Sequence, residues 1–194
     1  EGGIESGYVG TSNVHFSRLY HTRPVGTVAH EWTMAHAGLF GIEEANRQAL
    51  CRWIEVYEGD YLIALTDTFT TRLFLESFDA ELARAYAGVR HDSGDPFVFV
   101  ERILEHYKKN GIDPRSKTLV FSDGLNVDRA IAIERYIGSR VAAAYGIGTN
   151  FTNDFEGSPS LNFVIKMTEI EGEPVAKISD DHGKMTGHGQ TLTQ

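Results

Sequence analysis

The stretch KTLVFSDGLNVDRAIAIERYIG, residues 117–138, decides the fold class. It begins with an apolar run of strand length, continues through the polar turn SDG (122–124), and ends in a segment whose apolar residues have helical spacing. The same plan occurs in residues 60–78 and 86–111, and a further strand and turn follow in RVAAAYGIGTN (140–150). Repeated strand–turn–helix units predict right-handed βαβ connections and a parallel sheet in an α/β protein.

Polar residues concentrate in the turns that follow these predicted strands. The turns are TDT (66–68), RHDSGDP (90–96), SDG (122–124) and GIGTN (146–150). Because the carboxyl ends of parallel strands meet at one edge of the sheet, we expect these turns to lie together. That edge is where α/β enzymes, with open or closed sheets, build their active sites. The pattern therefore predicts an enzyme.

The plan changes after residue 158. The stretch LNFVIKMTEIEGEPVAKISDD (161–181) has the pattern of two strands joined around Glu171 and Gly172, which predicts an antiparallel hairpin. We expect this hairpin to pack away from the parallel strands. We divide the chain into residues 1–158, which carry the polar loops, and residues 159–194, which form the C-terminal strands.

Composition narrows the range of functions. The 194 residues are 41% hydrophobic and 23% charged, which is ordinary for one globular domain. The net charge of −9 argues against a general binder of nucleic acid or of membrane surfaces, since both need basic surfaces. No apolar run approaches the roughly 20 residues that cross a bilayer. The single cysteine, Cys51, fits a reducing compartment, so we expect a cytoplasmic protein with neither a nucleic-acid nor a membrane partner.

The stretch GTVAHEWTMAH (26–36) contains two histidines at the start of a predicted helix. His30 and His36 are six residues apart, about 240° around a helix of roughly 3.6 residues per turn, so they point to different sides and do not form a zinc pair. Thr27 is a candidate N-cap, which puts His30 at the third helical position, where free N–H groups and the helix dipole stabilise negative charge. A neutral imidazole there can act as a nucleophile. A core histidine is the alternative for His30, and it is the preferred interpretation of His36.

The turn RHDSGDP allows both a structural and a functional interpretation. Asp95 is the expected N-cap before Pro96, and Asp92 with Ser93 could simply form the turn. Arg90, placed where a strand ends, could stack on a flat ring or bind a carboxylate through two N–H groups.

Two further turns are also ambiguous. In SDG, Asp123 either caps the next helix or holds ribose hydroxyls or Mg²⁺. GIGTN is either an ordinary βα turn or a cradle of backbone N–H groups for a phosphate, which glycine lets approach closely. It is not a Rossmann fingerprint, because the third glycine is missing.

Taken together, these motifs resemble those of the nicotinate phosphoribosyltransferase family. The matching stretches are GTSN (10–13), GTVAHEW (26–32), ALTDTF (64–69), GVRHDSGDP (88–96), KTLVFSDGLN (117–126), YGIGTN (145–150) and NFVIKMTEIEGEPVAKISD (162–180). The resemblance implies a distorted, TIM-like α/β barrel whose C-terminal hairpin belongs to an α/β sandwich domain. It also implies a reaction that joins nicotinate to phosphoribosyl pyrophosphate in NAD salvage, with coupled ATP hydrolysis and Mg²⁺. Members usually form homodimers with active sites near the interface.

The same resemblance implies roles for particular residues. His30 matches the histidine that ATP phosphorylates. Thr27 and Arg90 match contacts to nicotinate. The residues implied to bind phosphoribosyl pyrophosphate are Asp92, Ser93, Asp123, Gly124, Gly148 and Thr149, with Asp67 as a further candidate, and no set of metal ligands is assigned.

Three further interpretations belong with this one. The family's arginine-rich N-terminal region has no counterpart here, and the chain opens EGGIESGYVGTSN without a methionine, so we expect the C-terminal part of a longer polypeptide. The residues of the motifs GTSN and GTVAHEW favour nicotinate as the substrate, but an enzyme that uses nicotinamide is the alternative within the class. A non-catalytic barrel fragment or assembly module is the alternative from another class.

Overall fold

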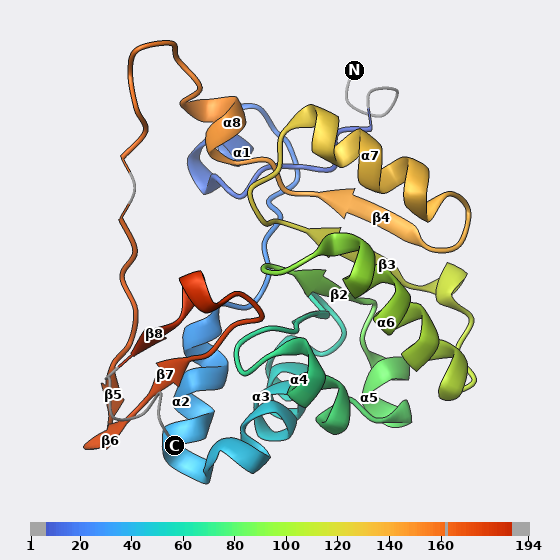
Figure 1. Cartoon of the computed structure of the whole chain (residues 1–194), viewed down its shortest axis with the longest axis vertical. Helices are drawn as coiled ribbons and strands as arrows, with labels where there is room; N and C mark the ends of the chain where they lie inside the picture. Colours follow the sequence, from blue (N-terminus) through green and yellow to red (C-terminus); the bar gives the residue numbers. More distant parts are fainter. Residues whose placement is uncertain (1–6, 162, 188–194) are drawn as a thin grey trace.

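The computed structural model describes residues 7–161 and 163–187, and at its centre lies a four-stranded parallel sheet (Figure 1). The strands are β1 (Ile63–Leu65), β2 (Gly88–His91), β3 (Thr118–Phe121) and β4 (Ala142–Tyr145). They lie in the order β1-β2-β3-β4 and every neighbouring pair is parallel. The prediction of a parallel α/β fold is therefore confirmed.

The sheet is open within the described residues, with β1 and β4 as its two edges. Its two faces are covered unequally, because Leu119 and Phe121 of β3 are buried while the alternate residues Thr118 and Val120 are only partly covered. The expected barrel is thus not confirmed by residues 7–161 and 163–187.

Helices connect the strands on the well-covered face. They are α4 (Thr71–Ser77), α5 (Ala80–Ala85), α6 (Pro96–Lys109) and α7 (Val127–Ile137), and the short 3-10 helix η1 (Pro114–Ser116) precedes β3. In Figure 1, α6 and α7 lie side by side across the strands. The main core forms between them and the sheet, where Phe99, Ile103 and Ile133 join Leu119 and Phe121.

Of the two long helices on this face, α6 has the expected N-cap and α7 does not. Asp95 caps α6, accepting hydrogen bonds from the backbone N–H groups of Phe97 and Val98, with Pro96 in the first turn, as predicted. Helix α7 is capped by Asn126 rather than by Asp123. The side chain of Asp123 is therefore free for other contacts.

The N-terminal part contributes α1 (Val14–Leu19) and an antiparallel helix pair, α2 (His30–Phe40) and α3 (Ile42–Tyr57), which packs beside β1 and α4. Gly41 joins α2 to α3 with φ of +84°, a conformation that favours glycine. Cys51 is half-buried and packs against the core, as a small apolar residue does. Within the described ranges, no helix combines the length and the apolar character needed to cross a membrane.

The C-terminal part begins with the short helix α8 (Thr149–Thr152) and runs as an extended segment to α2 (Figure 1). There β5 (Glu169–Ile170) and β6 (Glu173–Pro174) form the predicted hairpin around Glu171 and Gly172. The final strands β7 (Ala176–Lys177) and β8 (Thr186–Gly187) also pair antiparallel, with the 3-10 helix η2 (His182–Lys184) between them. Residues 188–194 of the predicted C-terminal unit lie outside the described residues.

The expectation that this segment packs away from the parallel strands is wrong for its last part. The backbone N–H groups of Ile178 and Ser179 donate to the carbonyl of Thr68, in the loop that follows β1. The hairpin itself packs against α2 at Gly38, where an added Cβ would lie 2.3 Å from Ile170 Cγ2. The segment thus reaches from α2 to the carboxyl edge of the sheet.

Candidate functional site

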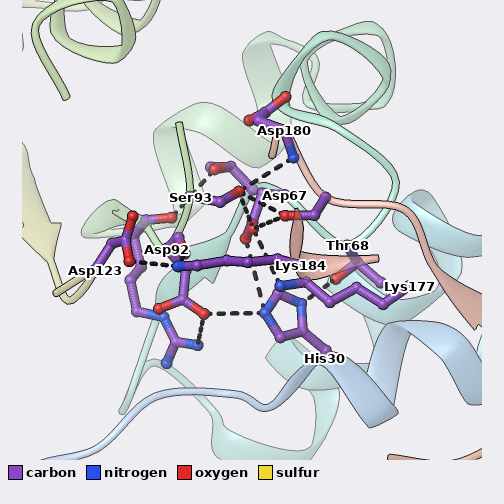
Figure 2. Close-up of polar contacts among 12 residues, drawn as sticks. His30, Asp67, Thr68, Asp92, Ser93, Asp123, Lys177, Asp180 and Lys184 are labelled. Carbon is purple, nitrogen blue, oxygen red and sulfur yellow. Dashed lines mark hydrogen bonds and ion pairs between the residues drawn. The ribbon is translucent and has the colours of Figure 1, made fainter. Parts of the chain in front are cut away.

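The loops after β1 and β2 converge on the first residue of α2, and the loop after β3 joins them through a hydrogen bond from Ser122 to Asp92 (Figure 2). His30 is buried there between two loops. Its Nε2 donates to Asp92 Oδ2 at 3.0 Å, and its Nδ1 shares a 3.0 Å hydrogen bond with the Thr68 hydroxyl. Asp67 Oδ1 lies 3.8 Å from Nε2. The expectation that these polar turns meet at one edge is confirmed.

The prediction that Thr27 caps this helix is wrong. Helix α2 begins at His30, its N-cap position is Ala29, and no side chain caps it. Thr27 does not cap because its hydroxyl instead accepts a hydrogen bond from the Arg90 guanidinium. His30 is therefore the first helical residue rather than the third. It still lies among the unpaired N–H groups of a helix N-terminus, which favour negative charge.

His36 is a structural residue, as expected. Its side chain is buried, its Nδ1 donates to the carbonyl of Trp32 at 2.7 Å, and its ring packs between Trp32 and Phe40. It takes no part in the cluster around His30.

Asp92 is held in its charged form. Burial alone would raise the pKa of this carboxyl, but hydrogen bonds from His30 and Ser122 and the charge of Arg90 lower the pKa well below its usual range. A charged Asp92 can only accept hydrogen bonds, so it orients the imidazole of His30.

Asp67 is fully buried and only partly satisfied. Its Oδ2 accepts a hydrogen bond from Ser93 and lies 3.5 Å from the ammonium of Lys177. Its Oδ1 has no hydrogen-bond partner in the described part of the chain. A buried carboxylate oxygen without a partner is costly, so its position next to His30 suits a bound donor or cation. Three potential metal ligands lie within 4.8 Å of one another, one atom each from His30, Asp67 and Asp92. This group of atoms could hold a metal ion.

Arg90 lies beside this cluster. Besides its bond to Thr27, its Nη2 lies 3.6 Å from Asp92 Oδ2. Its Nε is buried and has no partner among the described residues. The guanidinium is thus held at one end, and its Nε is a hydrogen-bond donor without a partner in this part of the structure.

Asp123 and Gly124 follow β3 at the same edge. The Asp123 carboxylate pairs with the ammonium of Lys184, which also donates to the backbone carbonyl of Asp92 at 2.8 Å. Gly124 has φ of +52°, which a glycine adopts without strain. Lys184 therefore links the loops after β2 and β3.

Gly148 and Thr149 lie at the start of α8, beside the loop after β3. Gly146 N–H donates to the carbonyl of Phe121, and the Asn150 amide donates to the carbonyl of Leu125. An added Cβ at Gly148 would meet no atom within 4 Å. The structure thus places this loop at the expected edge, but hydrogen bonds among the described residues do not join Gly148 or Thr149 to the His30 cluster.

The sequence analysis missed the contribution of the C-terminal segment. Four residues of this segment contact the loops around His30, namely Lys177, Ser179, Asp180 and Lys184. The available signal was the charged run KISDDHGK (177–184), which follows a predicted strand as the other polar turns do. Thr68 was missed as well, although it lies within the quoted turn TDT.

A parallel sheet with helices between its strands and a polar cluster at its carboxyl edge defines the class. These are α/β proteins that bind their ligands in the loops at that edge. A family model described as the nicotinate phosphoribosyltransferase (NAPRTase) family matches residues 3–194, and the chain belongs to this family.

Comparison with individual relatives gives the same family. The chain is 49% identical over 186 residues to a nicotinate phosphoribosyltransferase of Methanosarcina acetivorans, which covers 94% of this chain and 46% of the relative. It is 49% identical over 190 residues to that of Desulforapulum autotrophicum, which covers 95% of this chain and 49% of the relative. The chain spans about half the length of these relatives.

Solved structures give the same result. The crystal structure of nicotinate phosphoribosyltransferase from Vibrio cholerae matches with a TM-score of 0.93 at 42% identity, over 98% of this chain and 47% of that one. The enzyme from Porphyromonas gingivalis matches with a TM-score of 0.92 at 39% identity, over 96% of this chain and 50% of that one. The described fold is therefore that of half of such a protein.

Proposed function

We propose that this chain carries the central part of the active site of a nicotinate phosphoribosyltransferase. The enzyme would join nicotinate to phosphoribosyl pyrophosphate, giving nicotinate mononucleotide and pyrophosphate in NAD salvage, with coupled ATP hydrolysis. The observation that carries the proposal is a buried histidine at a helix N-terminus that is bound by the loops after β1 and β2, in a chain of this family.

Arg90 and Thr27 are proposed to bind nicotinate. The Thr27 hydroxyl holds one end of the guanidinium, and the buried Nε of Arg90 is left with a donor to offer. A planar guanidinium can stack on a pyridine ring or bind its carboxylate through two N–H groups. Because Arg90 also neighbours Asp92, it would bring the ring toward the sugar.

The phosphoribosyl pyrophosphate is proposed to lie along the loops after β2, β3 and β4. The residues assigned to it are Asp92, Ser93, Asp123, Gly124, Gly148 and Thr149. Carboxylates suit ribose hydroxyls, and the glycines let backbone N–H groups approach a phosphate. The ammonium groups of Lys177 and Lys184 add positive charge at this edge, which the overall charge of −9 makes valuable for an anionic substrate.

Mg²⁺ is the proposed cofactor beside ATP. The unpartnered Oδ1 of Asp67 and the charged carboxylate of Asp92 are the oxygen ligands that Mg²⁺ prefers, so the residues present fit the ion. When bound, the ion would neutralise charge on the pyrophosphate.

In the proposed reaction the pyridine nitrogen of nicotinate forms a bond to C1 of the ribose. The bond from C1 to the pyrophosphate oxygen breaks, and its electron pair leaves with pyrophosphate. The protein has little covalent chemistry to perform in this step. Arg90 aligns the ring, the loops hold the sugar, and the lysines stabilise the departing charge.

His30 is the proposed site of phosphorylation by ATP. A ring nitrogen would take the terminal phosphoryl group while ADP leaves, and water would later release phosphate. That nitrogen must first part from its present partner, which is Thr68 or Asp92. The unpaired N–H groups of α2 would stabilise the new negative charge. Phosphorylation would couple ATP to the reaction by shifting affinities for substrates and products.

The remaining expectations are also proposals. We propose that the four parallel strands are part of a distorted barrel and that the hairpin belongs to a sandwich domain, each completed by the rest of a longer protein. We further propose a cytoplasmic homodimer with active sites near the interface and no nucleic-acid or membrane partner.

The test is made in the full-length protein with nicotinate or nicotinamide, phosphoribosyl pyrophosphate, ATP and Mg²⁺. We expect nicotinate mononucleotide to form, with much slower turnover of nicotinamide. γ-labelled ATP should leave an acid-labile, base-stable phosphate that His30→Ala abolishes. The matched control His36→Ala alters the other histidine of the same helix and should retain the label. Equal labelling of both variants would refute the role of His30, and absence of turnover would refute the activity.

A further inference from the structure

Asp180, between β7 and η2, contacts the loops that follow both β1 and β2 (Figure 2). Its carboxylate accepts from the first residue of α4: the Thr71 N–H lies 3.0 Å from Oδ1, and the Thr71 hydroxyl lies 2.5 Å from Oδ2. Its own backbone N–H donates to the Ser93 hydroxyl at 3.1 Å. Asp180 therefore joins three segments that are far apart in the sequence.

These contacts continue to a neighbour of His30. Ser93 accepts hydrogen bonds from Asp180 and, at 2.9 Å, from the hydroxyl of Ser179. Because both of these groups are donors, the single proton of the Ser93 hydroxyl is free to go to Asp67. The orientation of the Asp67 carboxylate, whose Oδ1 faces His30, thus depends on the segment that carries Asp180.

Backbone strain occurs at the same place. The carbonyl of Thr68 accepts from the N–H groups of Ile178 and Ser179, at 2.8 and 3.4 Å. Thr70 and Ser179 have φ of +80° and +69°, in the left-handed region that a residue other than glycine rarely adopts. Such strain persists only where surrounding contacts over-determine the backbone. The hydrogen bonds of Asp180 are among the contacts that hold these two segments together.

We propose that Asp180 is a positioning residue, which joins the segment after β7 to the loops after β1 and β2 so that Asp67 and Thr68 face His30. The proposal rests on the function proposed above, which gives His30 its role. Asp180 acts through Thr71 and Ser93, and it contacts neither His30 nor Asp92.

A simple helix cap would explain only some of these contacts. Asp79 is such a cap, since it accepts from the N–H groups of Glu81 and Leu82 at the start of α5. Its other partner is Arg47, on the surface of α3. Asp79→Asn therefore weakens a cap of the same kind away from the carboxyl edge, and it is the matched control.

The first test is kinetic and uses the full-length protein. Asp180→Asn keeps the shape of the side chain but replaces the acceptor of the Thr71 hydroxyl with an amide. Thr71→Val keeps the volume of the partner and removes its hydroxyl. We expect either change to lower kcat roughly tenfold and to alter KM for nicotinate by less than about twofold, because the nicotinate contacts at Arg90 remain. The double variant should lose little more than Thr71→Val alone, since Thr71→Val already removes the hydroxyl that contacts Asp180, together with its contact to Thr66.

The second test does not depend on turnover. In protein labelled with ¹⁵N-histidine, the side-chain signals of His30, identified by their loss in His30→Gln, should shift at constant pH in Asp180→Asn and in Thr71→Val. They should stay in place in Asp79→Asn. Thermal melts establish that each variant folds, and Thr71→Val decides the matter if Asp180→Asn does not fold.

His30 signals that do not move in the folded variants would overturn the proposal, as would fully additive losses of kcat. The proposal would also be overturned if Asp79→Asn changed kcat and the His30 signals as much as Asp180→Asn does. The changes would then follow from the loss of any helix cap. If even the unaltered protein fails to turn over nicotinate, the proposed function fails, while the His30 signals still decide whether Asp180 positions this residue.

Discussion

At the scale of the single residue, Asp92 connects three side chains of the site. Its carboxylate accepts from His30 and neighbours Arg90, and its backbone carbonyl accepts from Lys184. The hydrogen bonds from His30 and Ser122 and the charge of Arg90 outweigh the cost of burial and lower the pKa of the carboxyl. A carboxyl whose pKa is lower in the folded than in the unfolded state stabilises the folded protein at pH values above its ordinary pKa, which is roughly 3.9 for aspartate. This stabilisation is lost as the pH falls toward the lowered pKa.

Asp92→Asn should therefore change how stability depends on pH. Between pH 6 and pH 3 the unaltered protein should lose roughly 1 kcal/mol more of its free energy of unfolding than the variant, because over this range only the unfolded chain takes up the proton, and the difference should keep growing below pH 3. Denaturant unfolding at a series of pH values measures the difference. Parallel curves for the two proteins would show that Asp92 makes no such contribution.

At the scale of the element, each loop owes its position to the strand before it and to its own turn residues. Gly148 illustrates this, because it ends the turn after β4 and opens α8. An added Cβ at this position would meet no atom within 4 Å, although φ of −96° and ψ of −100° suit glycine better than a β-branched residue. A binding defect in a variant that melts like the unaltered protein would thus report on a ligand rather than on folding.

Gly148→Val should weaken binding of phosphoribosyl pyrophosphate by about a hundredfold or more, because the branched side chain occupies the space proposed for the 5-phosphate. Thr149→Val should cost less, on the order of 1.5–3 kcal/mol for a lost hydrogen bond to a charged group. Calorimetric titration measures both affinities, with thermal melts as the folding control. Normal affinity in folded Gly148→Val would mean that the phosphate binds elsewhere.

At the scale of the whole molecule, the C-terminal segment adds to the site by returning to the sheet. Residues 176–187 pass from α2 to the carboxyl edge and bring Lys177 and Lys184 to the loops around His30 (Figure 1, Figure 2). Both lysines face carboxylates in the described structure. The segment thereby balances part of the negative charge at an edge that is proposed to receive an anion.

Lys184→Gln should raise Kd for phosphoribosyl pyrophosphate roughly tenfold and make binding less sensitive to salt, because one cation is lost from the site. Lys109→Gln is the matched control, since Lys109 is exposed in the last turn of α6, away from this edge. Titrations at low and high salt compare the two variants. Equal effects of the two changes would indicate only the loss of one surface charge.

The sequence was sufficient for features that depend on neighbouring residues. The alternation of apolar runs, polar turns and helical spacing predicted the parallel strands, the capping of α6 by Asp95 and the hairpin around Glu171 and Gly172. The order of the motifs also pointed to the family that the comparisons show. These features follow from local backbone preferences and from the period of each element, which the sequence displays directly.

Only the tertiary structure decided which groups surround His30. Thr27 binds Arg90 instead of capping α2, and Asp180 meets Thr71 across 109 positions of sequence. Lys184 likewise reaches the carbonyl of Asp92 from 92 positions away. Contacts over such separations depend on how the finished elements pack and on where buried polar groups find partners. No local pattern contains that information, so the fold class could be predicted from the chain alone, whereas the partners of its central histidine required the folded molecule.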